Sequence, residues 1–382
     1  MLESFQQPVH WPIEYTGKMR GIFAAWLLGG VLVAPLLGDD IEDAFDVGIG
    51  EWSASAGYGY RENVLFSEIA PVDSTFGYVS FEGIAHKEFT QTGGDWTSMA
   101  LLDNRRYFQR SNLPDETFGL LLTEYGRFLT IDGRLTGGLQ YVYFNQAFDA
   151  TFDVLDLRQI GVQAQEPGVY LEWESFFWQF GYTAEAGFSR MYFEDSEDDY
   201  ETLDWEFEAD YLVSDSWSLT AALNGFVRDY TDRPAREISG ARLDSVALGT
   251  DQAGIELALE TKCTLWGIAG ELEVVVDFEA RRDRHFGFYD RDSIKYGIEW
   301  RGGGENWNAH VDFGHAQRNY LYQTVENGSL RSSSDWVWSA ELERDLNSSW
   351  AAFLRIDGDE SDSNETFFSY EANTVLVGMR FK

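Results

Sequence analysis

The sequence predicts an all-β fold, namely a transmembrane antiparallel up-and-down β-barrel of about 16 strands, with short periplasmic turns and long extracellular loops. Three observations support this prediction. Apolar and polar residues alternate with a period of two over long segments, tight turns alternate with longer polar loops, and tryptophans recur beside the tight turns. A period of two places successive side chains on opposite faces of a β-strand.

The stretch 202–213, TLDWEFEADYLV, shows the period most clearly. Its odd positions are apolar or aromatic, and its even positions from Asp204 to Asp210 are all carboxylates. In a soluble sheet, the apolar face would form a core and the acidic face would contact water. In an outer-membrane barrel, the apolar face contacts lipid and the acidic face lines a wet lumen.

Similar segments follow one another along the chain and are longer than the ~5–6 residues of a typical soluble strand. Their length suits strands that cross a membrane at a tilt. The expected strands are 46–61, 74–88, 95–109, 115–131, 133–146, 154–173, 175–193, 200–213, 216–231, 251–264, 266–283, 289–302, 305–320, 333–346, 348–360 and 367–382.

The connections between these segments alternate in length. Short turns are expected at QTGGD, TIDG, WESF, VSDS, KCTL, GGGEN and LNSS, and longer polar loops lie between them. A barrel with tight turns on the periplasmic rim and long loops on the outer rim gives this alternation. An even number of strands places both ends of the barrel on the periplasmic side.

Tryptophans cluster near the short turns. Because the indole ring is apolar and its N–H needs a polar partner, tryptophan is enriched at membrane interfaces. The alternative is a set of turn-capping tryptophans in a soluble sheet. The expected interface aromatics are Trp96, Trp173, Trp178, Trp217, Trp266, Trp307 and Trp350.

The first 38 residues have the layout of an export signal. Lys18 and Arg20 precede an apolar run, 21–38, that ends in small residues and is followed by two aspartates. We therefore expect residues 1–38 to be an N-terminal extension and signal peptide, with Met19 as the start, and residues 39–382 to form the barrel. A membrane-spanning anchor is the alternative for the apolar run.

Composition excludes several classes of protein. The chain has 65 acidic and 28 basic residues, a net charge of −37, and 16% aromatic residues. The aromatic content excludes an acidic disordered protein, and the charge with no basic stripe argues against nucleic-acid binding. The single cysteine, Cys263, excludes a disulfide framework. No phosphate-binding glycine loop or calcium-loop spacing is present, so we expect no cofactor and no metal site.

Alternation also assigns the side chains that should face the lumen. Carboxylates dominate this set, so we expect a lumen that favours cations and repels anions. The expected lumen-lining acidic residues are Asp204, Glu206, Glu208, Asp210, Glu256, Glu260, Glu271, Glu273, Asp277, Glu279, Glu341 and Glu343. The expected inward basic residues are fewer, namely Arg61, Arg134, Lys262, Arg281, Lys295, Arg301, Arg318, Arg355 and Arg380.

The segment 231–251 is the longest polar connection in the chain. It carries Arg233, Arg236 and Arg242, and would narrow the pore if it folded inward opposite the acidic wall. The alternative is a mobile surface loop.

An enzymatic function has weak support. His310 and Asp312 lie two residues apart on one face of an expected strand, with Ser339 or Arg318 as conceivable neighbours. No catalytic motif surrounds them, so we expect no enzyme activity.

Two stretches resemble a broad group of outer-membrane β-barrel porins, some of which are encoded in exopolysaccharide operons. GYGYRENVLFSEIAPVDSTFGYVSFEG (57–83) is similar to the first hairpin of that group, and FFSYEANTVLVGMRFK (367–382) is similar to its final strand. The resemblance implies an outer-membrane barrel with a role in polysaccharide export. Outer-membrane barrels commonly end in an aromatic residue, whereas Lys382 follows Phe381 here.

The expected function is an outer-membrane channel with an acidic, water-filled lumen in a Gram-negative bacterium. Hydrophilic cargo would pass passively, by polysaccharide export or by solute diffusion that favours cations. The expected partners are outer-membrane lipid and lipopolysaccharide, the barrel-assembly machinery, and a hydrophilic solute or polysaccharide. The alternatives are a structural or adhesive outer-membrane barrel and a soluble secreted β-protein.

Overall fold

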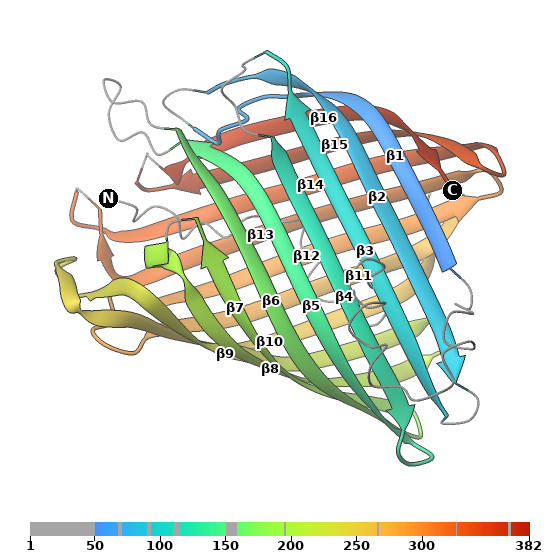
Figure 1. The fold of residues 1–382 in the computed structure, drawn as a ribbon, viewed down its shortest axis with the longest axis horizontal. Helices are drawn as coiled ribbons and strands as arrows, with labels where there is room; N and C mark the ends of the chain where they lie inside the picture. The colour runs from blue at the N-terminus through green and yellow to red at the C-terminus, as the bar shows by residue number, and fades with distance from the viewer. Residues whose placement is uncertain are drawn as a thin grey trace, which may run out of the picture.

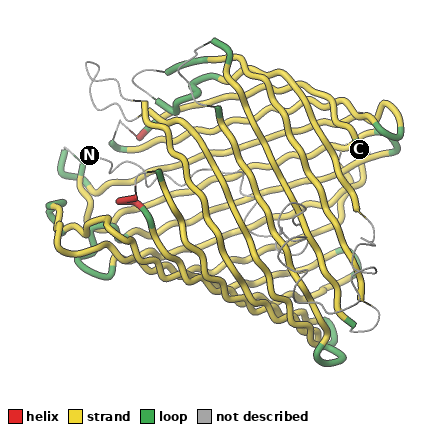
Figure 2. Tube along the Cα trace, viewed as in Figure 1, coloured by secondary structure: helices red, strands yellow, loops and turns green. Residues whose placement is uncertain are grey.

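The computed structural model describes residues 50–67, 71–89, 93–109, 115–149, 159–194, 196–265, 267–325, 327–365 and 368–382. Within them, sixteen β-strands form one closed barrel, and a short 3-10 helix follows the seventh strand (Figure 1). Strands make up nearly all of the wall (Figure 2). The all-β, sixteen-strand antiparallel barrel expected from the sequence is confirmed.

The barrel elements are β1 (Gly50–Arg61), β2 (Ser74–Phe89), β3 (Gly94–Tyr107), β4 (Glu116–Phe128), β5 (Gly133–Asp149), β6 (Gln159–Phe177), β7 (Phe180–Phe193), η2 (Ser196–Asp198), β8 (Tyr200–Ser214), β9 (Trp217–Arg236), β10 (Arg242–Leu265), β11 (Ile268–Asp283), β12 (Arg291–Gly304), β13 (Trp307–Thr324), β14 (Leu330–Asn347), β15 (Trp350–Ser363) and β16 (Tyr370–Phe381). Each strand pairs with its sequence neighbours, and β1 pairs with β16 to close the sheet.

The strand β1 starts, and β16 ends, at the end of the barrel that carries the tight turns. The end of β16 and the β4–β5 turn lie toward the right of Figure 1, and the β9–β10 hairpin lies at the left. We call these the short-turn end and the long-loop end. No helix in the described part of the chain is long and apolar enough to cross a membrane.

The barrel exterior is a continuous apolar surface because the register keeps one parity of every strand on that side. Leu203 stands opposite Val227, and Leu257 stands opposite Val276 on the next strand pair. Leu203, Leu223 and Leu257 expose 54%, 46% and 47% of their surface. Large apolar side chains left in contact with the surroundings over a whole barrel indicate a lipid-facing surface.

The seam between β1 and β16 has the shortest ladder. Ala54–Arg61 pairs with 374–381, whereas the full length of β1 pairs with β2. At its short-turn end, the Phe381 ring lies 5.2 Å from Trp52 and 5.0 Å from Trp350. The expected strand-final aromatic residue is therefore packed between two tryptophans.

Lys382 follows this cluster and fastens β16 to β14. Its Nζ lies 2.6 Å from Asp345 Oδ1 and 2.7 Å from Glu343 Oε1. Burial lowers the pKa of Lys382, but hydrogen bonds to Asp345 and Glu343 outweigh this effect and raise the pKa above its usual value. Lys382 therefore links the end of β16 to β14 through two ion pairs.

Two connections differ from those that the sequence predicts. The tight turn expected at WESF lies inside β6, which continues to Phe177 and turns at 178–179. Pairing continues because Glu174 stands opposite Arg134 on β5 and forms an ion pair with it at 3.9 Å. Trp178 takes the left-handed turn conformation with φ of 63°.

The segment 231–251 is also not an extended loop. β9 continues to Arg236 and β10 begins at Arg242, so only 237–241 remain as a turn, in which Gly240 has φ of 85°. The ladder is irregular at Ala247, which stands opposite Pro234. A β-bulge can accommodate a proline, which has no N–H to donate to the ladder. Because the bulge shifts the two-residue period, the alternation of apolar and polar residues is not evident in the sequence here.

We expect a substitution to arginine to change the free energy of unfolding by different amounts on the two faces of β9. We expect Leu223→Arg, on the apolar exterior, to lower the free energy of unfolding by about 2–4 kcal/mol. Asn224→Arg, on the opposite face and across from Glu206, should change it by less than about 1 kcal/mol. Urea unfolding of the protein in lipid vesicles, followed by tryptophan fluorescence, measures both changes. Equal destabilisation by the two variants would contradict the assignment of the faces.

Candidate functional site

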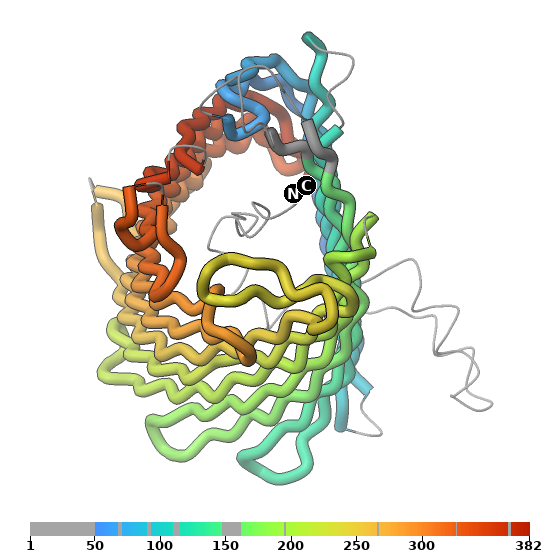
Figure 3. The backbone as a smooth tube through the Cα atoms, turned by 90° about the vertical axis from the view of Figure 1, so that its left-hand side faces the viewer, coloured from blue at the N-terminus to red at the C-terminus, as the bar shows by residue number. Residues whose placement is uncertain are grey.

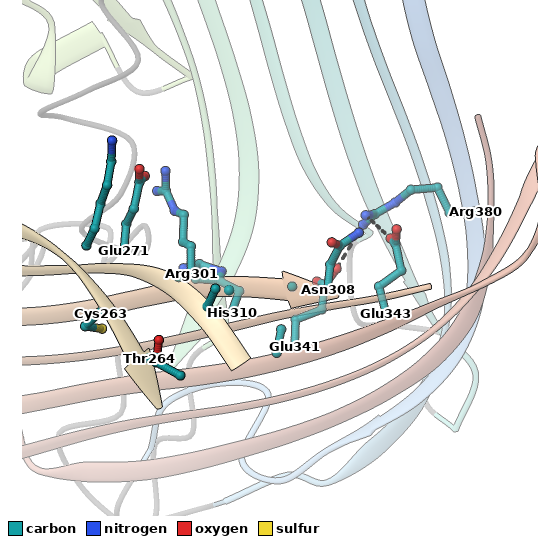
Figure 4. A pocket seen from close by; sticks show the side chains of 15 residues that line it. Cys263, Thr264, Glu271, Arg301, Asn308, His310, Glu341, Glu343 and Arg380 are labelled. Carbon is teal, nitrogen blue, oxygen red and sulfur yellow. Dashed lines mark hydrogen bonds and ion pairs between the residues drawn. The ribbon is translucent and has the colours of Figure 1, made fainter. Parts of the chain in front are cut away.

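The candidate site is the interior wall of the barrel. The register places all twelve carboxylates expected in the lumen on the face opposite the apolar exterior, namely Asp204, Glu206, Glu208, Asp210, Glu256, Glu260, Glu271, Glu273, Asp277, Glu279, Glu341 and Glu343. Glu271 and Glu341 project from the strands toward the open interior (Figure 4).

Two rows of carboxylates run directly across neighbouring strands. Glu172 stands opposite Glu185, which stands opposite Glu206. A second row runs from Glu260 through Glu273 and Glu299 to Asp312. Like charges directly opposite one another destabilise a sheet. Arg301 forms an ion pair with Glu299 and offsets part of this repulsion in the second row, and water and counter-cations in the lumen can offset more of it.

Further interior carboxylates are likewise held by basic side chains. Lys295 Nζ lies 3.0 Å from Asp277 Oδ2 and also contacts Glu279. Arg134 lies 2.6 Å from Asp95. The acidic wall is therefore neutralised locally on some strands and not uniformly acidic.

A cavity of about 990 Å³ opens near the short-turn end. It is lined on β10–β14 and β16 by both signs of charge, including Lys262, Glu271, Arg301, His310 and Arg380. Glu271 and Arg301 rise from their strands into this space (Figure 4). Such a lining is wet and suits hydrophilic rather than apolar cargo.

Arg380 bridges two strands at the edge of this cavity. It donates to Glu341 Oε1 at 3.1 Å, contacts Glu343 Oε2, and donates from Nε to Ser55 Oγ at 3.2 Å. Glu343 is only 5% exposed, and Lys382 provides its second basic partner. These contacts tie β14, β16 and β1 together from the inside.

The possible catalytic group around His310 has a different geometry from a hydrolase site. Ser339 donates its hydroxyl to Asp312 Oδ2. His310 Nε2 lies 3.6 Å from Glu299 Oε1. The serine hydroxyl is thus engaged by a carboxylate, whereas activation of a serine nucleophile needs a base such as histidine to take that proton. The arrangement fits wall polarity and ion pairing.

The three arginines proposed to form a constriction lie at the long-loop end. Arg233 contacts Asp198 Oδ1 at 3.0 Å, and Arg242 contacts both Glu197 and Asp244. Arg236 donates to the Gly240 carbonyl at 2.5 Å. These ion-pair partners of Arg233 and Arg242 lie in the η2 segment and in the hairpin itself, rather than on the carboxylate rows.

The β9–β10 hairpin nevertheless lies over the barrel opening in the view along the barrel (Figure 3). Its base packs against the β11–β12 connection, because Tyr230, Leu248 and Tyr289 form one buried cluster with Phe288 beside it. Leu248 is only 1% exposed. The hairpin is therefore anchored by apolar contacts as well as by ion pairs.

The sequence did not predict a second inward segment, which follows β1. Val64 and Leu65 pack into a buried cluster with Phe353 and Leu376 on the interior face. Asn63 holds the turn, since its side chain accepts from the Ser67 amide at 2.8 Å and donates to the Glu371 carbonyl at 3.0 Å. The apolar pair Val64–Leu65 within a polar connection was the feature of the sequence that could have indicated this inward packing.

An apolar patch on the interior of β3–β7 was also not predicted. Met99, Leu122 and Phe144 belong to one buried cluster on the same parity as the carboxylates. The sequence run Leu120–Leu122 is apolar on both faces, so its alternation is lost. The interior therefore has an apolar part and a charged part.

Six of the seven tryptophans expected at the interface lie in described residues, and Trp266 lies outside them. Trp217, Trp307 and Trp350 begin β9, β13 and β15 at the short-turn end, each 42–45% exposed. Trp96 and Trp173 lie on strands near the same end, and Trp178 forms a turn there. Trp96 donates to Thr123 Oγ1 at 3.0 Å.

Comparison with known proteins gives matches in structure only. No protein-family model matches the chain, and no curated protein matches it. Among solved structures, it is similar to Acinetobacter baumannii OccAB4, with a TM-score of 0.46, 10% identity, and coverage of 88% of this chain and 98% of that one.

Two further solved structures give similar values. A BenF-like porin from Pseudomonas fluorescens Pf-5 has a TM-score of 0.45, 9% identity, and coverage of 88% and 99%. A loop L8 deletion mutant of OmpT, an outer membrane protein of Vibrio cholerae, has a TM-score of 0.41, 8% identity, and coverage of 87% and 99%. The pairing of the sixteen strands of this chain into a closed barrel establishes its fold. That closed barrel, with its apolar exterior, has the architecture of an outer-membrane, porin-like barrel, as expected from the sequence.

The contacts of Arg380 with Glu341 and Glu343 should contribute measurably to the free energy of unfolding. We expect Arg380→Met to lower the free energy of unfolding by about 1–3 kcal/mol, because Glu341 and Glu343 lose a charged donor. Arg344→Met is the matched control, since Arg344 contacts the Trp307 ring at 4.8 Å and should lose less than about 1 kcal/mol. Urea unfolding in vesicles measures both changes. A larger loss in the control would contradict the role of Arg380 in tying β14, β16 and β1 together.

Proposed function

We propose that this chain is an outer-membrane channel through which hydrophilic solutes diffuse passively, with cations favoured over anions. The observation that carries the proposal is the pair of carboxylate rows on the interior face of a closed sixteen-strand barrel. Barrels of this strand number are wide enough to leave an aqueous channel.

The charge of the interior supports the preference for cations. Carboxylates that face one another across strands place negative charge on the interior wall, and a low-dielectric wall around that charge concentrates cations in the lumen. The row through Glu260, Glu273 and Glu299 lies toward the short-turn end, where the cavity of about 990 Å³ also opens. A cation that enters this part of the lumen meets carboxylates from four adjacent strands.

The proposal includes the expected partners and processing. A channel of this kind contacts outer-membrane lipid and lipopolysaccharide, is inserted by the barrel-assembly machinery, and is exported by a cleaved signal within residues 1–38. These residues lie outside the described part of the chain. The support for the lipid contact is the apolar exterior, and the support for the signal is the sequence pattern alone.

Polysaccharide export rests on the sequence resemblance alone. Inward aromatic rings that sugars would stack on have other roles here. Tyr170 donates to Glu124 Oε2 at 2.6 Å, and Phe353 is buried in the cluster that holds the β1–β2 connection. We therefore favour solute diffusion. The proposal includes no enzymatic step.

Reversal potentials in planar bilayers test the selectivity. We expect a permeability ratio of K⁺ to Cl⁻ above one for the wild type under a KCl gradient, and a ratio closer to one for Glu273→Gln, because that substitution removes charge from the row. Glu360→Gln is the control, since Glu360 stands opposite Trp336 on the exterior parity and should leave the ratio unchanged.

Two results would oppose the proposal. Absence of conductance from protein that shows the folded, heat-modifiable band on a gel would reject the channel. A wild-type ratio at or below one would reject the preference for cations and leave the channel itself intact.

A further inference from the structure

Three arginines meet on the interior wall near the long-loop end. Arg281 lies near the end of β11, directly opposite Arg291, the first residue of β12. Arg228 on β9 lies on the other side of Arg281, and both Arg228 and Arg291 act on Arg281 electrostatically. We call these three residues the arginine triad. Like charges placed this close repel one another, so their persistence requires a compensating group.

Two members of the triad are buried with unsatisfied donors. Arg281 and Arg291 are 6% and 8% exposed. The Nε of each, and Nη1 of Arg291, have no hydrogen-bond partner. A guanidinium is always charged, and a buried charge is normally paired. These nitrogens therefore mark a place where negative charge is expected.

Other interior arginines nearby show what a paired arginine looks like in this barrel. Arg61 lies 3.1 Å from Glu116, and Arg318 forms an ion pair with Asp335. Within the described residues, no member of the triad forms an ion pair. These pairs, between β1 and β4 and between β13 and β14, neutralise one side of the long-loop end, whereas the described residues of β9–β12 have no such pair at the triad.

The groups that surround the triad are mostly neutral hydroxyl acceptors and aromatic rings. Arg228 donates from Nε to Thr202 at 3.2 Å, and Arg281 donates from Nη2 to Thr250 at 3.3 Å. Arg228 also lies over the Tyr200 ring at 4.1 Å and the Phe226 ring at 4.6 Å. Hydroxyl and ring contacts orient a guanidinium without neutralising it.

Two carboxylates lie in the vicinity but do not neutralise the triad. Glu166 acts on Arg228 electrostatically, and Glu279 is influenced by Arg291. Glu279 is already held by Lys295, and neither carboxylate makes an ion pair with the triad. The net charge around the triad is therefore positive, although the chain as a whole is strongly acidic.

We propose that the arginine triad is an oxyanion-binding site on the interior wall, which takes a carboxylate, sulfate or phosphate group. Arg281 and Arg291 present planar donor forks, and such forks bind oxyanions through paired charge-assisted hydrogen bonds. The site lies beyond the carboxylate rows, at the opposite end of β11 from Glu271 and Glu273. The inference concerns binding and does not require that the barrel conducts.

The site is roofed on the long-loop side by the base of the β9–β10 hairpin. Tyr230 belongs to the buried cluster with Leu248 and Tyr289, and it also lies beside Arg281 and Arg228. A low-dielectric roof strengthens the attraction between the bound anion and the guanidinium groups.

Isothermal titration of the folded protein in detergent micelles tests the inference. Sodium sulfate is titrated at constant ionic strength maintained with sodium chloride, and sodium galacturonate is titrated in a parallel series. We expect saturable binding of at least one probe by the wild type, and at least tenfold weaker binding by Arg291→Gln and Arg281→Gln. Arg282→Gln is the control. Arg282 follows Arg281 on the exterior face and is paired with Asp292 at 2.6 Å, so its affinity should stay within twofold of the wild type.

The two probes separate the sources of the oxyanion. Binding of sulfate alone indicates an inorganic ion, and binding of galacturonate indicates a sugar carboxylate. Absence of saturable binding of both probes by the wild type overturns the inference, and so does unchanged affinity in Arg291→Gln. The heat-modifiable gel shift confirms folding. Should Arg291→Gln not fold, Arg291→Lys retains the charge without the fork, and unchanged affinity in that variant would likewise reject the site.

The outcome is distinguishable from that of the channel proposal. Binding is measured in micelles without ion flow, so a non-conducting barrel can still bind the probe. Conversely, a conducting barrel in which sulfate and galacturonate do not bind keeps the proposed function and loses only the oxyanion site.

Discussion

The structure depends on one constraint, which is that every backbone N–H and C=O in a lipid-embedded sheet must find a partner within the sheet. Only a closed barrel meets this requirement with strands, because closure removes both edges. Once the sheet is closed, strict alternation divides the side chains between lipid and lumen. The apolar exterior and the charged interior are therefore two results of one geometry, and they hold together in β8, where Trp205 and Glu206 are adjacent residues with opposite surroundings.

This constraint explains why much of the fold could be predicted from the sequence. Strands with one apolar face, such as β8 and β11, were located to within a few residues, because lipid contact and water contact demand opposite chemistry. Prediction failed where the alternation weakens. The turn at Trp178 was placed too early because Glu174 continues the β5 pairing, and the β9–β10 hairpin was taken for a loop because Pro234 and a bulge interrupt its period.

The candidate site was less predictable than the fold, and the reason is physical. Alternation assigns the side of the wall that a residue faces, but it gives neither the axial position nor the partner. Glu343 and Arg380 lie 37 residues apart and meet because β14 and β16 both pair with β15, which brings their inward side chains together across it. Arg228 continued the inward parity of its strand and could have been assigned inward. Its proximity to Arg281, by contrast, required the register between β9, β10 and β11.

The short ladder between β1 and β16 gives the wall an unequal resistance to lateral opening. Fewer backbone hydrogen bonds resist separation there than between β1 and β2, and the contact of Phe381 with Trp52 reinforces its short-turn end. At its other end, the backbone of Glu62 donates to Asn373. Under mechanical or thermal load, we therefore expect the barrel wall to open first along the β1–β16 ladder. Separation would begin between the two ends of this ladder, and β1 would detach from β16 before any other pair of neighbouring strands separates.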